Sequence, residues 1–317
     1  MRFPKSLAAA ALIAALAAGC GSASGSSATS TATQTQAPAA PPAFPVTINA
    51  SNGPVQIAQR PTRIVSLSPT ATEMLYAIGA GKQVVAVDSD SDYPATAPHT
   101  SLSGFQPNIE AIASYSPDLV IAANDPGGLV KSLHSLSIPV LLEPAAVKLT
   151  DSYTQISQLG QATGHSAQAA ALDKTMRTQI AKLVASVPKP TRQYSVYNEL
   201  DDTYFSATSS TFIGQIYRAF GLKNIADKAK GAGGGYPQLS SEYIVAANPS
   251  LIFLADTKCC HQTPATVAAR PGWSHIAAVV HHQVVPVDDD IASRWGPRVV
   301  DFYRIVAKHV AEAEKGG

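Results

Sequence analysis

Residues 108–122 read NIEAIASYSPDLVIA, and residues 240–254 read SSEYIVAANPSLIFL. Each stretch predicts a short helix with a polar cap, a proline that ends the helix, and a buried apolar strand. The glutamate and the proline of the two stretches recur at one common spacing of 132 residues. A pair of similar lobes is the simplest explanation of this internal repeat, and convergent patterning without common descent is the alternative.

From residue 60 onward, short β-branched runs alternate with helical patterns. Residues 64–67 and 84–87 are expected to be strands, with a helix between them over residues 69–79. Thr70 and Glu73 have the spacing of a capping box at the start of that helix. This alternation predicts an α/β fold of two similar lobes, each with a central parallel-type sheet, and a ligand cleft between the lobes.

A single long helical pattern connects the two expected lobes. It covers residues 165–187, has an apolar side and is ended by Pro188. At about 1.5 Å per residue, this helix would be roughly 35 Å long. Because one stiff helix resists wide hinge motion, only slight closure of the lobes on a ligand is expected. The resulting division is a lipoprotein signal peptide (1–19), a lipid-anchored flexible linker (20–59), an N-terminal lobe (60–164), a connecting helix (165–188) and a C-terminal lobe (189–317).

The start of the chain carries no charged side chain between Lys5 and Arg60. Its apolar run, residues 7–18, is too short to span a bilayer but has the length of the apolar region of a secretory signal. The small residues before Cys20 resemble the lipobox of bacterial lipoproteins, which implies cleavage before Cys20 and acylation of its thiol. An ordinary secretory signal is the alternative. Both kinds of signal predict an extracytoplasmic protein. The lipoprotein signal also predicts that the protein is anchored to the cell membrane by lipid.

The charge balance argues against nucleic acid as a partner. The chain has 23 Lys and Arg against 22 Asp and Glu, a formal net charge of +1, so counterion release would provide little driving force. The sequence also gives an enzyme little support. Residues 79–82 lack the flanking glycine and hydroxyl residue of a phosphate-binding loop, and no G-x-S-x-G motif occurs.

Two kinds of metal site need to be considered. A receptor for a bare metal ion would require several converging ligands, and His99, Glu199 and Asp290 are the candidates, although their spacing does not demand a site. The adjacent Cys259 and Cys260 allow a vicinal disulfide, two free thiols or a metal site. A metal is least favoured there because the C-x₂-C spacing is missing. The oxidised and reduced states of the pair both remain open.

The order of motifs over residues 60–313 resembles the periplasmic binding proteins of the iron-complex and cobalamin uptake class. The resemblance rests on four parts of the sequence: RIVSLSPTATE at 63–73, SDYP at 91–94, the two repeated stretches above, and DIASRWGPR at 290–298. It implies two α/β lobes joined by one backbone helix. It also implies a non-enzymatic, monomeric receptor without a cofactor of its own, which delivers a small-molecule ligand to the permease dimer of an ABC importer.

Ligands of open α/β sheets bind beyond the carboxyl ends of the strands, so the loops that follow strands are the candidate site. A broad planar macrocycle needs aromatic faces and a few polar groups. The predicted ligand-binding residues are Tyr93, Phe105, Glu199, Phe205, Tyr236, Asp290 and Arg294. Local packing, turn formation or a simple Asp290–Arg294 ion pair is the alternative role of these side chains.

Resemblance to the cobalamin-binding members implies that Tyr93 contacts a corrin ring and that Tyr236 stands at an aromatic position. It implies polar ligand contacts for Asp290 and Arg294. A corrinoid is therefore the expected ligand. Glu199 lies where those members are expected to have an apolar ring, so a ferric siderophore or haem remains the alternative.

Glu110 and Glu242 each lie at the start of an expected short helix, where the helix dipole favours a carboxylate. That local effect is one explanation of their position. In the family, the matching acidic residues, one in each lobe, face arginine pockets on the two permease subunits. The resemblance therefore implies that Glu110 and Glu242 dock the receptor on its permease.

Overall fold

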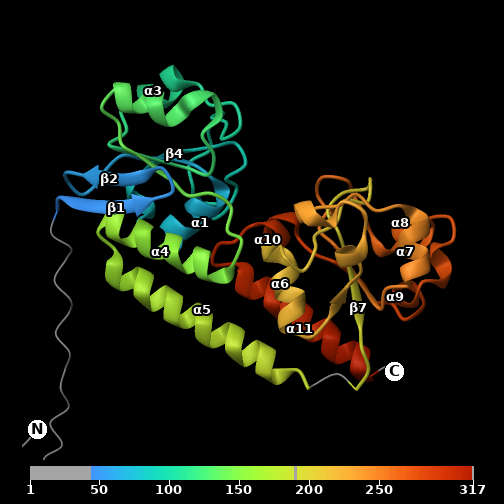
Figure 1. The fold of residues 1–317 in the computed structure, drawn as a ribbon. Coiled ribbons are helices and arrows are strands. Elements are labelled where there is room, and N and C mark those ends of the chain that lie inside the picture. Colours follow the sequence, from blue (N-terminus) through green and yellow to red (C-terminus); the bar gives the residue numbers. More distant parts are fainter. Residues whose placement is uncertain (1–43, 189–190, 316–317) are drawn as a thin grey trace, which may run out of the picture. The chain divides into compact units, whose positions relative to one another are not determined.

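The computed structural model describes residues 44–188 and 191–315. The expected signal peptide, Cys20 and most of the expected linker lie outside the described residues. Two four-stranded parallel sheets form the centres of two lobes (Figure 1). The strands are β3 (Ile64–Leu67), β4 (Val84–Val87), β5 (Leu119–Ala122) and β6 (Val140–Leu142) in the N-terminal lobe, and β7 (Ser195–Glu199), β8 (Lys223–Asn224), β9 (Leu251–Leu254) and β10 (Val284–Pro286) in the C-terminal lobe.

The two sheets have the same topology. Their strand orders, β4-β3-β5-β6 and β8-β7-β9-β10, are equivalent strand by strand. The register is equivalent too, because Ile64 lies beside Leu119 and Val196 lies beside Leu251. Val196 lies 132 positions after Ile64, and Leu251 lies 132 positions after Leu119. The same spacing separates Glu110 from Glu242. The predicted pair of similar α/β lobes is confirmed.

Helices cover the faces of both sheets. The N-terminal lobe contains α1 (Pro69–Ala77), α2 (Ile109–Ser114), α3 (Leu129–Ser135) and α4 (Leu149–Thr163), and α5 (Ser166–Ser186) follows it. The C-terminal lobe contains α6 (Phe212–Ala219), α7 (Ser241–Ala247), α8 (Pro264–Ala268), α9 (Ala277–Val280), α10 (Asp289–Ser293) and α11 (Val299–Lys315). Within the described part of the chain, no helix combines the length and the hydrophobicity needed to cross a membrane.

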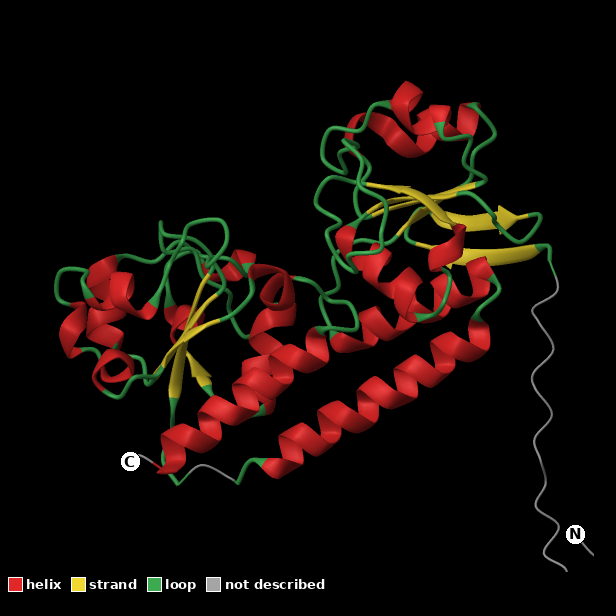
Figure 2. Ribbon diagram, turned by 180° about the vertical axis from the view of Figure 1, so that it is seen from behind, coloured by secondary structure: helices red, strands yellow, loops and turns green. Residues whose placement is uncertain are grey.

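The predicted connecting helix is α5, and its bounds differ from the expected ones by one residue at each end. Ala169, Met176 and Ile180 on its apolar side are buried. The C-terminal helix α11 packs along α5 (Figure 1, Figure 2). The sequence pattern predicted one linking helix, whereas the structure pairs that helix with a second one.

The expected flexible linker extends too far, because an antiparallel hairpin lies within residues 20–59. It consists of β1 (Val46–Ala50) and β2 (Gly53–Ile57). Ile48 and Ile57 are buried in the core, so the hairpin belongs to the folded protein. The Asn-Gly pair at 52–53, between alternating apolar residues, is a hairpin signal that identifies this element, and Gly53 has a φ of +98°.

The start of α1 also differs from the prediction. Ser68, not Thr70, is the N-cap, and its hydroxyl accepts a hydrogen bond from the backbone N–H of Ala71. Glu73 therefore does not belong to a capping box. Its carboxylate is buried and forms ion pairs with residues of the other lobe.

Candidate ligand-binding site

Four exposed aromatic side chains lie in loops after the strands. They are Tyr93 (47% exposed), Phe105 (71%), Phe205 (37%) and Tyr236 (50%). In the described part of the chain, the other exposed large hydrophobic residues are aliphatic. Tyr93 and Phe105 belong to the N-terminal lobe, and Phe205 and Tyr236 to the C-terminal lobe. All four are members of the predicted ligand-binding set. Exposed large apolar side chains are candidates for a binding surface.

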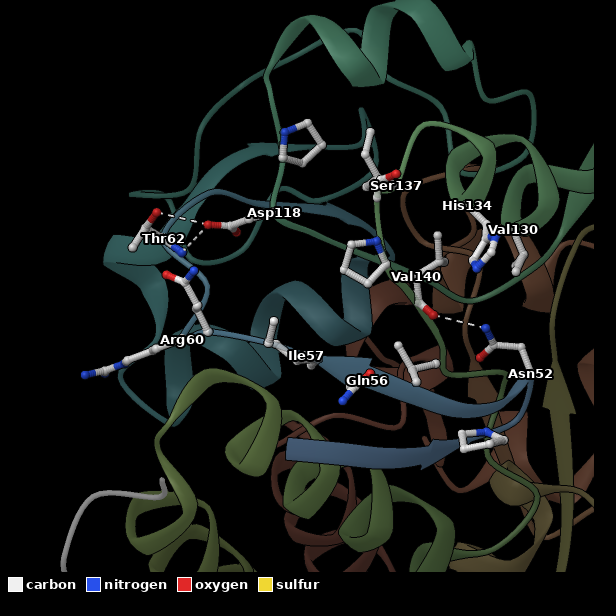
Figure 3. Close-up of a pocket in the computed structure, with 17 residues that line it drawn as sticks. Asn52, Gln56, Ile57, Arg60, Thr62, Asp118, Val130, His134, Ser137 and Val140 are labelled. Atoms are coloured by element: carbon white, nitrogen blue, oxygen red, sulfur yellow. Dashed lines mark hydrogen bonds between the residues drawn. The ribbon is translucent and has the colours of Figure 1, made fainter. Parts of the chain in front are cut away.

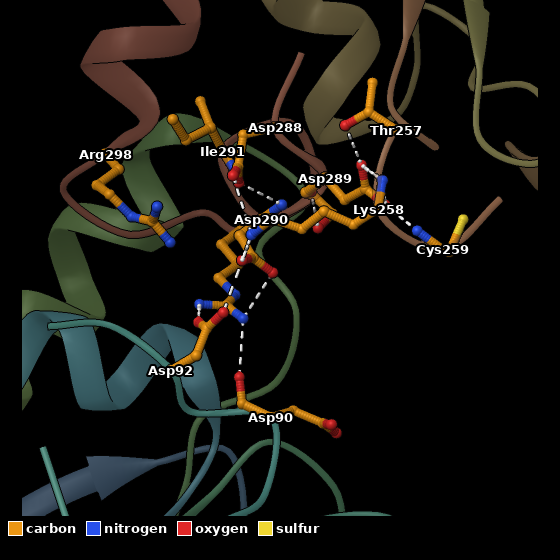
Figure 4. Close-up of polar contacts among 12 residues, drawn as sticks. Asp90, Asp92, Thr257, Lys258, Cys259, Asp288, Asp289, Asp290, Ile291 and Arg298 are labelled. Atoms are coloured by element: carbon orange, nitrogen blue, oxygen red, sulfur yellow. Dashed lines mark hydrogen bonds and ion pairs between the residues drawn. The ribbon is translucent and has the colours of Figure 1, made fainter. Parts of the chain in front are cut away.

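Arg294 connects the two lobes at this site. Its guanidinium forms an ion pair with Asp290 in its own lobe at 2.7 Å and donates to Asp92 in the N-terminal lobe at 2.9 Å. It also bonds to the Glu73 carboxylate at 3.0 Å. A further bond, at 2.8 Å, goes to the Asp90 carbonyl, in the group of polar contacts around Asp90, Asp92 and Asp290 that Figure 4 shows. The expected local ion pair between Asp290 and Arg294 is therefore present, but it is one part of a larger network that joins the lobes.

Lys258 is a site residue that the sequence analysis missed. Its ammonium lies 2.6 Å from Asp290, 2.9 Å from Asp288 and 3.9 Å from Asp92. The hydrogen bond to Asp290 is the largest contribution that raises the pKa of Lys258 to about 12, so the side chain is charged at neutral pH. The position of Lys258 just after β9, at the carboxyl end of the sheet, is the signal that identifies it.

The structure does not support direct ligand contact by Glu199. Its side chain is fully buried, and each carboxylate oxygen accepts a hydrogen bond from Arg270 at 2.6 Å. The Arg270 guanidinium also lies 4.6 Å from the Trp273 ring. Glu199 ends β7, but its side chain points to the face that packs on Arg270. A position at the end of a strand therefore did not place this carboxylate on the ligand-facing surface.

Asp256, just after β9, is a second buried carboxyl group next to Glu199. Both of its side-chain oxygens are buried and have no hydrogen-bond partner. Burial is the main cause that raises the pKa of Asp256 to about 8, and the charge of Glu199 raises it further. The raised pKa favours the protonated carboxyl group over the carboxylate at neutral pH.

This protonation predicts a pH-dependent stability. Asp256 binds its proton more tightly in the folded state, so its contribution to the free energy of unfolding falls as pH rises from about 4 to about 8. Relative to the wild type, the Asp256→Asn variant should gain stability over that interval, by on the order of a few kcal/mol. Urea unfolding at several pH values measures the difference. The exposed Asp202→Asn is the control, and a pH-independent difference for Asp256→Asn would contradict the prediction.

Cys259 and Cys260 are free thiols in the structure. The backbone N–H groups of Lys258 and Cys259 donate to the Asp289 carboxylate, which holds this loop. Burial and the neighbouring Cys260 raise the pKa of the Cys259 thiol to about 12. Within residues 44–188 and 191–315, no three His, Cys, Asp or Glu side chains are placed to hold a metal ion. The candidate metal site of His99, Glu199 and Asp290 is not formed, because both carboxylate oxygens of Glu199 accept hydrogen bonds from Arg270.

Glu110 and Glu242 occupy equivalent positions. Each is the second residue of its helix, α2 or α7, and each is exposed. The caps are equivalent as well, because Asn108 accepts from the N–H of Ala111 and Ser240 accepts from that of Tyr243. The predicted pair of capped helices is confirmed, and two carboxylates related by the repeat are available to a partner.

A large cavity of about 1050 Å³ lies elsewhere, in the N-terminal lobe beside β2 and α3 (Figure 3). No Phe, Tyr or Trp side chain lines it. Its main polar groups are already paired: the Asp118 carboxylate accepts the N–H groups of Thr62 and Arg63, and the Asn52 amide donates to the Val140 carbonyl. The cavity therefore lacks the Phe, Tyr and Trp faces that the predicted site provides.

Residues 64–291 match a protein-family model described as periplasmic binding protein. The chain belongs to the periplasmic binding protein family. It is 32% identical to an uncharacterized ABC transporter substrate-binding lipoprotein of Bacillus subtilis, with 84% of this chain and 86% of the relative covered. It is also 32% identical to a cobalamin-binding protein of Halobacterium salinarum, with 82% of this chain and 72% of the relative covered.

The solved structures include the periplasmic vitamin B12-binding protein BtuF of Vibrio cholerae. The match has a TM-score of 0.67 and 25% identity, and it covers 81% of this chain and 99% of the other. Family membership confirms the predicted two-lobe fold and the prediction of a transport receptor instead of an enzyme. It also agrees with the predicted extracytoplasmic location and with a small-molecule ligand and a permease as partners.

Proposed function

We propose that the protein captures a corrinoid between its two lobes and delivers it to the permease of an ABC importer. The observation that carries this proposal is the presence of four exposed aromatic rings, two from each lobe, in loops that follow strands. One of them, Tyr93, comes directly after Asp92, which pairs with Arg294 of the other lobe. Aromatic faces suit a broad macrocycle through dispersion and apolar burial. The similarity to relatives named as cobalamin-binding or vitamin B12-binding supports the same ligand class.

The charges of the site favour a corrinoid over more acidic ligands. Asp92, Asp288 and Asp290 lie together with Lys258 and Arg294 as their ion-pair partners, and the charge of Arg298 also acts on Asp288 and Asp290. Carboxylates accept hydrogen bonds from the amide N–H groups at the edge of a corrin ring. They repel carboxylate or catecholate groups, such as the propionates of haem. This repulsion makes haem and ferric siderophores less favoured than a corrinoid, and they are kept as the alternative ligands.

Titration of the ligand-free protein with cyanocobalamin, haem and several ferric siderophores tests the proposal. Quenching of tryptophan fluorescence or the heat of binding reports each ligand. Cyanocobalamin should saturate the protein at one molecule per chain, with a Kd of about 1 μM or below, which corresponds to about −8 kcal/mol. If haem or a siderophore saturates the protein and cyanocobalamin does not bind, the protein is a receptor for that other ligand and not for a corrinoid. Binding of none of them contradicts the receptor function.

Export and lipid anchoring complete the proposal. Cys20 would be acylated after signal cleavage, and this anchor would be the contact of a monomeric receptor with the membrane. Fractionation of cells that express the wild type and the Cys20→Ser variant tests the anchor. The wild type should fractionate with membranes and the variant should not. Equal membrane association of both would contradict lipid anchoring.

Glu110 and Glu242 are proposed to dock the receptor on the permease. The double variant Glu110→Arg/Glu242→Arg should abolish ligand uptake and leave ligand affinity unchanged, because opposed charges chiefly set orientation and encounter rate. The measurements are cellular uptake of labelled cobalamin and the Kd of the purified variant. Glu312→Arg, an exposed reversal on α11, is the matched control. Normal uptake by the double variant would remove the docking role.

A further inference from the structure

Glu73 is a buried acidic residue of α1 that the proposed binding role does not yet use. Its side chain is 1% exposed and lies against two arginines of the other lobe. One carboxylate oxygen accepts from Arg294 at 3.0 Å and from Arg298 at 2.6 Å, and the other accepts from Arg298 at 2.9 Å. A single carboxylate therefore compensates two guanidinium groups that come from the opposite lobe.

Each of these arginines leads directly to a predicted ligand contact. The Arg298 guanidinium lies over the Tyr93 ring, 4.3 Å from its centroid. Arg294 bonds to Asp92 and to Asp290. Continuous contacts therefore run from Glu73 to one aromatic face and to two carboxylates of the candidate site.

We propose that Glu73 is a positioning residue of the ligand site, which orients the Tyr93 ring through Arg298 and holds Arg294 between the lobes. This inference rests on the proposed function in that Tyr93 is taken as a ligand contact. The contacts alone provide the positioning. Glu73 fixes Arg298 by two hydrogen bonds, and Arg298 in turn covers one face of the ring.

The electrostatics explain why Arg298 depends on Glu73. Burial alone would lower the pKa of Arg298, but the hydrogen bonds and charge of Glu73, together with the charges of Asp288 and Asp290, outweigh burial and raise it. Without the Glu73 charge, the partly buried Arg298 guanidinium would lose its hydrogen-bonded carboxylate partner and keep only the weaker influence of Asp288 and Asp290, so it should turn toward water. Arg294 differs, because it would keep Asp92 and Asp290 as partners. Loss of Glu73 should therefore affect Tyr93 more than the Arg294 network.

The surroundings of Tyr93 leave room for such a movement. A cavity of about 450 Å³ is lined by Glu73, Tyr93 and Arg298 together with residues of α5 and α11. Packing alone does not fill the space beside the ring, so the cation above it provides the restraint. Ordering the ring before the ligand arrives lowers the entropic cost of binding.

The first test uses the ligand-free protein, so it does not depend on ligand identity. Fluorotyrosine is incorporated, and the Tyr93 resonance is assigned by its loss in Tyr93→Phe. Glu73→Gln keeps the size of the side chain and removes its charge. It should shift and narrow the Tyr93 fluorine resonance, as expected for a freed ring. Arg298→Met should reproduce the change even if Glu73→Gln folds poorly. Asp301→Asn, an exposed change beside the same cavity, should not. An unchanged Tyr93 resonance in both test variants overturns the proposal.

The second test links positioning to binding. Glu73→Gln should weaken cyanocobalamin binding about tenfold, the effect expected when one or two side chains must be ordered on binding. In a Tyr93→Ala background the same substitution should have little further effect, because the positioned ring is absent. An equal loss in both backgrounds would show a general structural role and overturn the proposal. If the wild type binds no cobalamin, the proposed function fails by its own titration, whereas the fluorine resonance still decides whether Glu73 positions Tyr93.

Discussion

Replacing Arg270 with methionine is expected to lower the free energy of unfolding by about 3–5 kcal/mol. Methionine keeps much of the apolar stem but removes the guanidinium, which donates to both oxygens of the fully buried Glu199. Glu199 would then be a buried charge without a partner. The protonated Asp256 beside it cannot compensate a negative charge. Urea unfolding followed by circular dichroism at pH 7 measures the loss.

Two further variants separate this effect from the loss of any arginine. Arg304→Met removes the exposed pair with Asp301 and should cost less than about 1 kcal/mol. Adding Glu199→Gln to Arg270→Met should restore part of the stability, because the uncompensated charge is removed as well. If Arg270→Met were no more destabilising than Arg304→Met, the account of this buried pair would be wrong.

Removal of the exposed aromatic rings should have the largest effect on binding. Tyr93→Ala and Tyr236→Ala are each expected to weaken cyanocobalamin binding by about 10- to 100-fold. This range corresponds to a free energy of roughly 1.5–3 kcal/mol, which is gained when a large apolar side chain is buried. Both rings are about half exposed in the ligand-free protein, so their area remains available for burial by a ligand. Isothermal titration calorimetry gives the Kd of each variant.

The controls for these variants are apolar residues of similar exposure outside the candidate site. Leu136 and Val280 are each 53% exposed and lie next to α3 and in α9. Leu136→Ala and Val280→Ala should change the affinity less than twofold. Affinities of Tyr93→Ala and Tyr236→Ala within that same margin would exclude these rings from the binding surface.

Local patterns predicted the features that depend on local physics. The apolar runs at 64–67, 119–122 and 251–254 became buried strands. The helix signals gave α5 almost to the residue, since its apolar side marks its extent and Pro188 fixes its C-terminal end. The repeat predicted two lobes because capped helix, proline and strand recur in one order. The exposed aromatic residues followed from the rule that loops after parallel strands bind ligands.

The features that were missed depend on contacts between distant residues. Glu73 and Arg294 are separated by 221 positions, so no local spacing reveals their ion pair. The burial of Glu199 depends on Arg270, which lies 71 positions further along the chain. The hairpin of β1 and β2 is different, because its Asn-Gly turn is a local signal. Its place after a long uncharged stretch led to its assignment as linker.

The most direct test of the central claim is a crystal structure of the protein with cyanocobalamin. The account predicts one corrin ring between the lobes, in contact with Tyr93 and Tyr236, with its amide groups near Asp290. Small lobe rotation relative to the ligand-free protein is also expected, because α5 and α11 pack together. A corrin ring bound in the large cavity beside β2 and α3, or away from both tyrosines, would contradict the account.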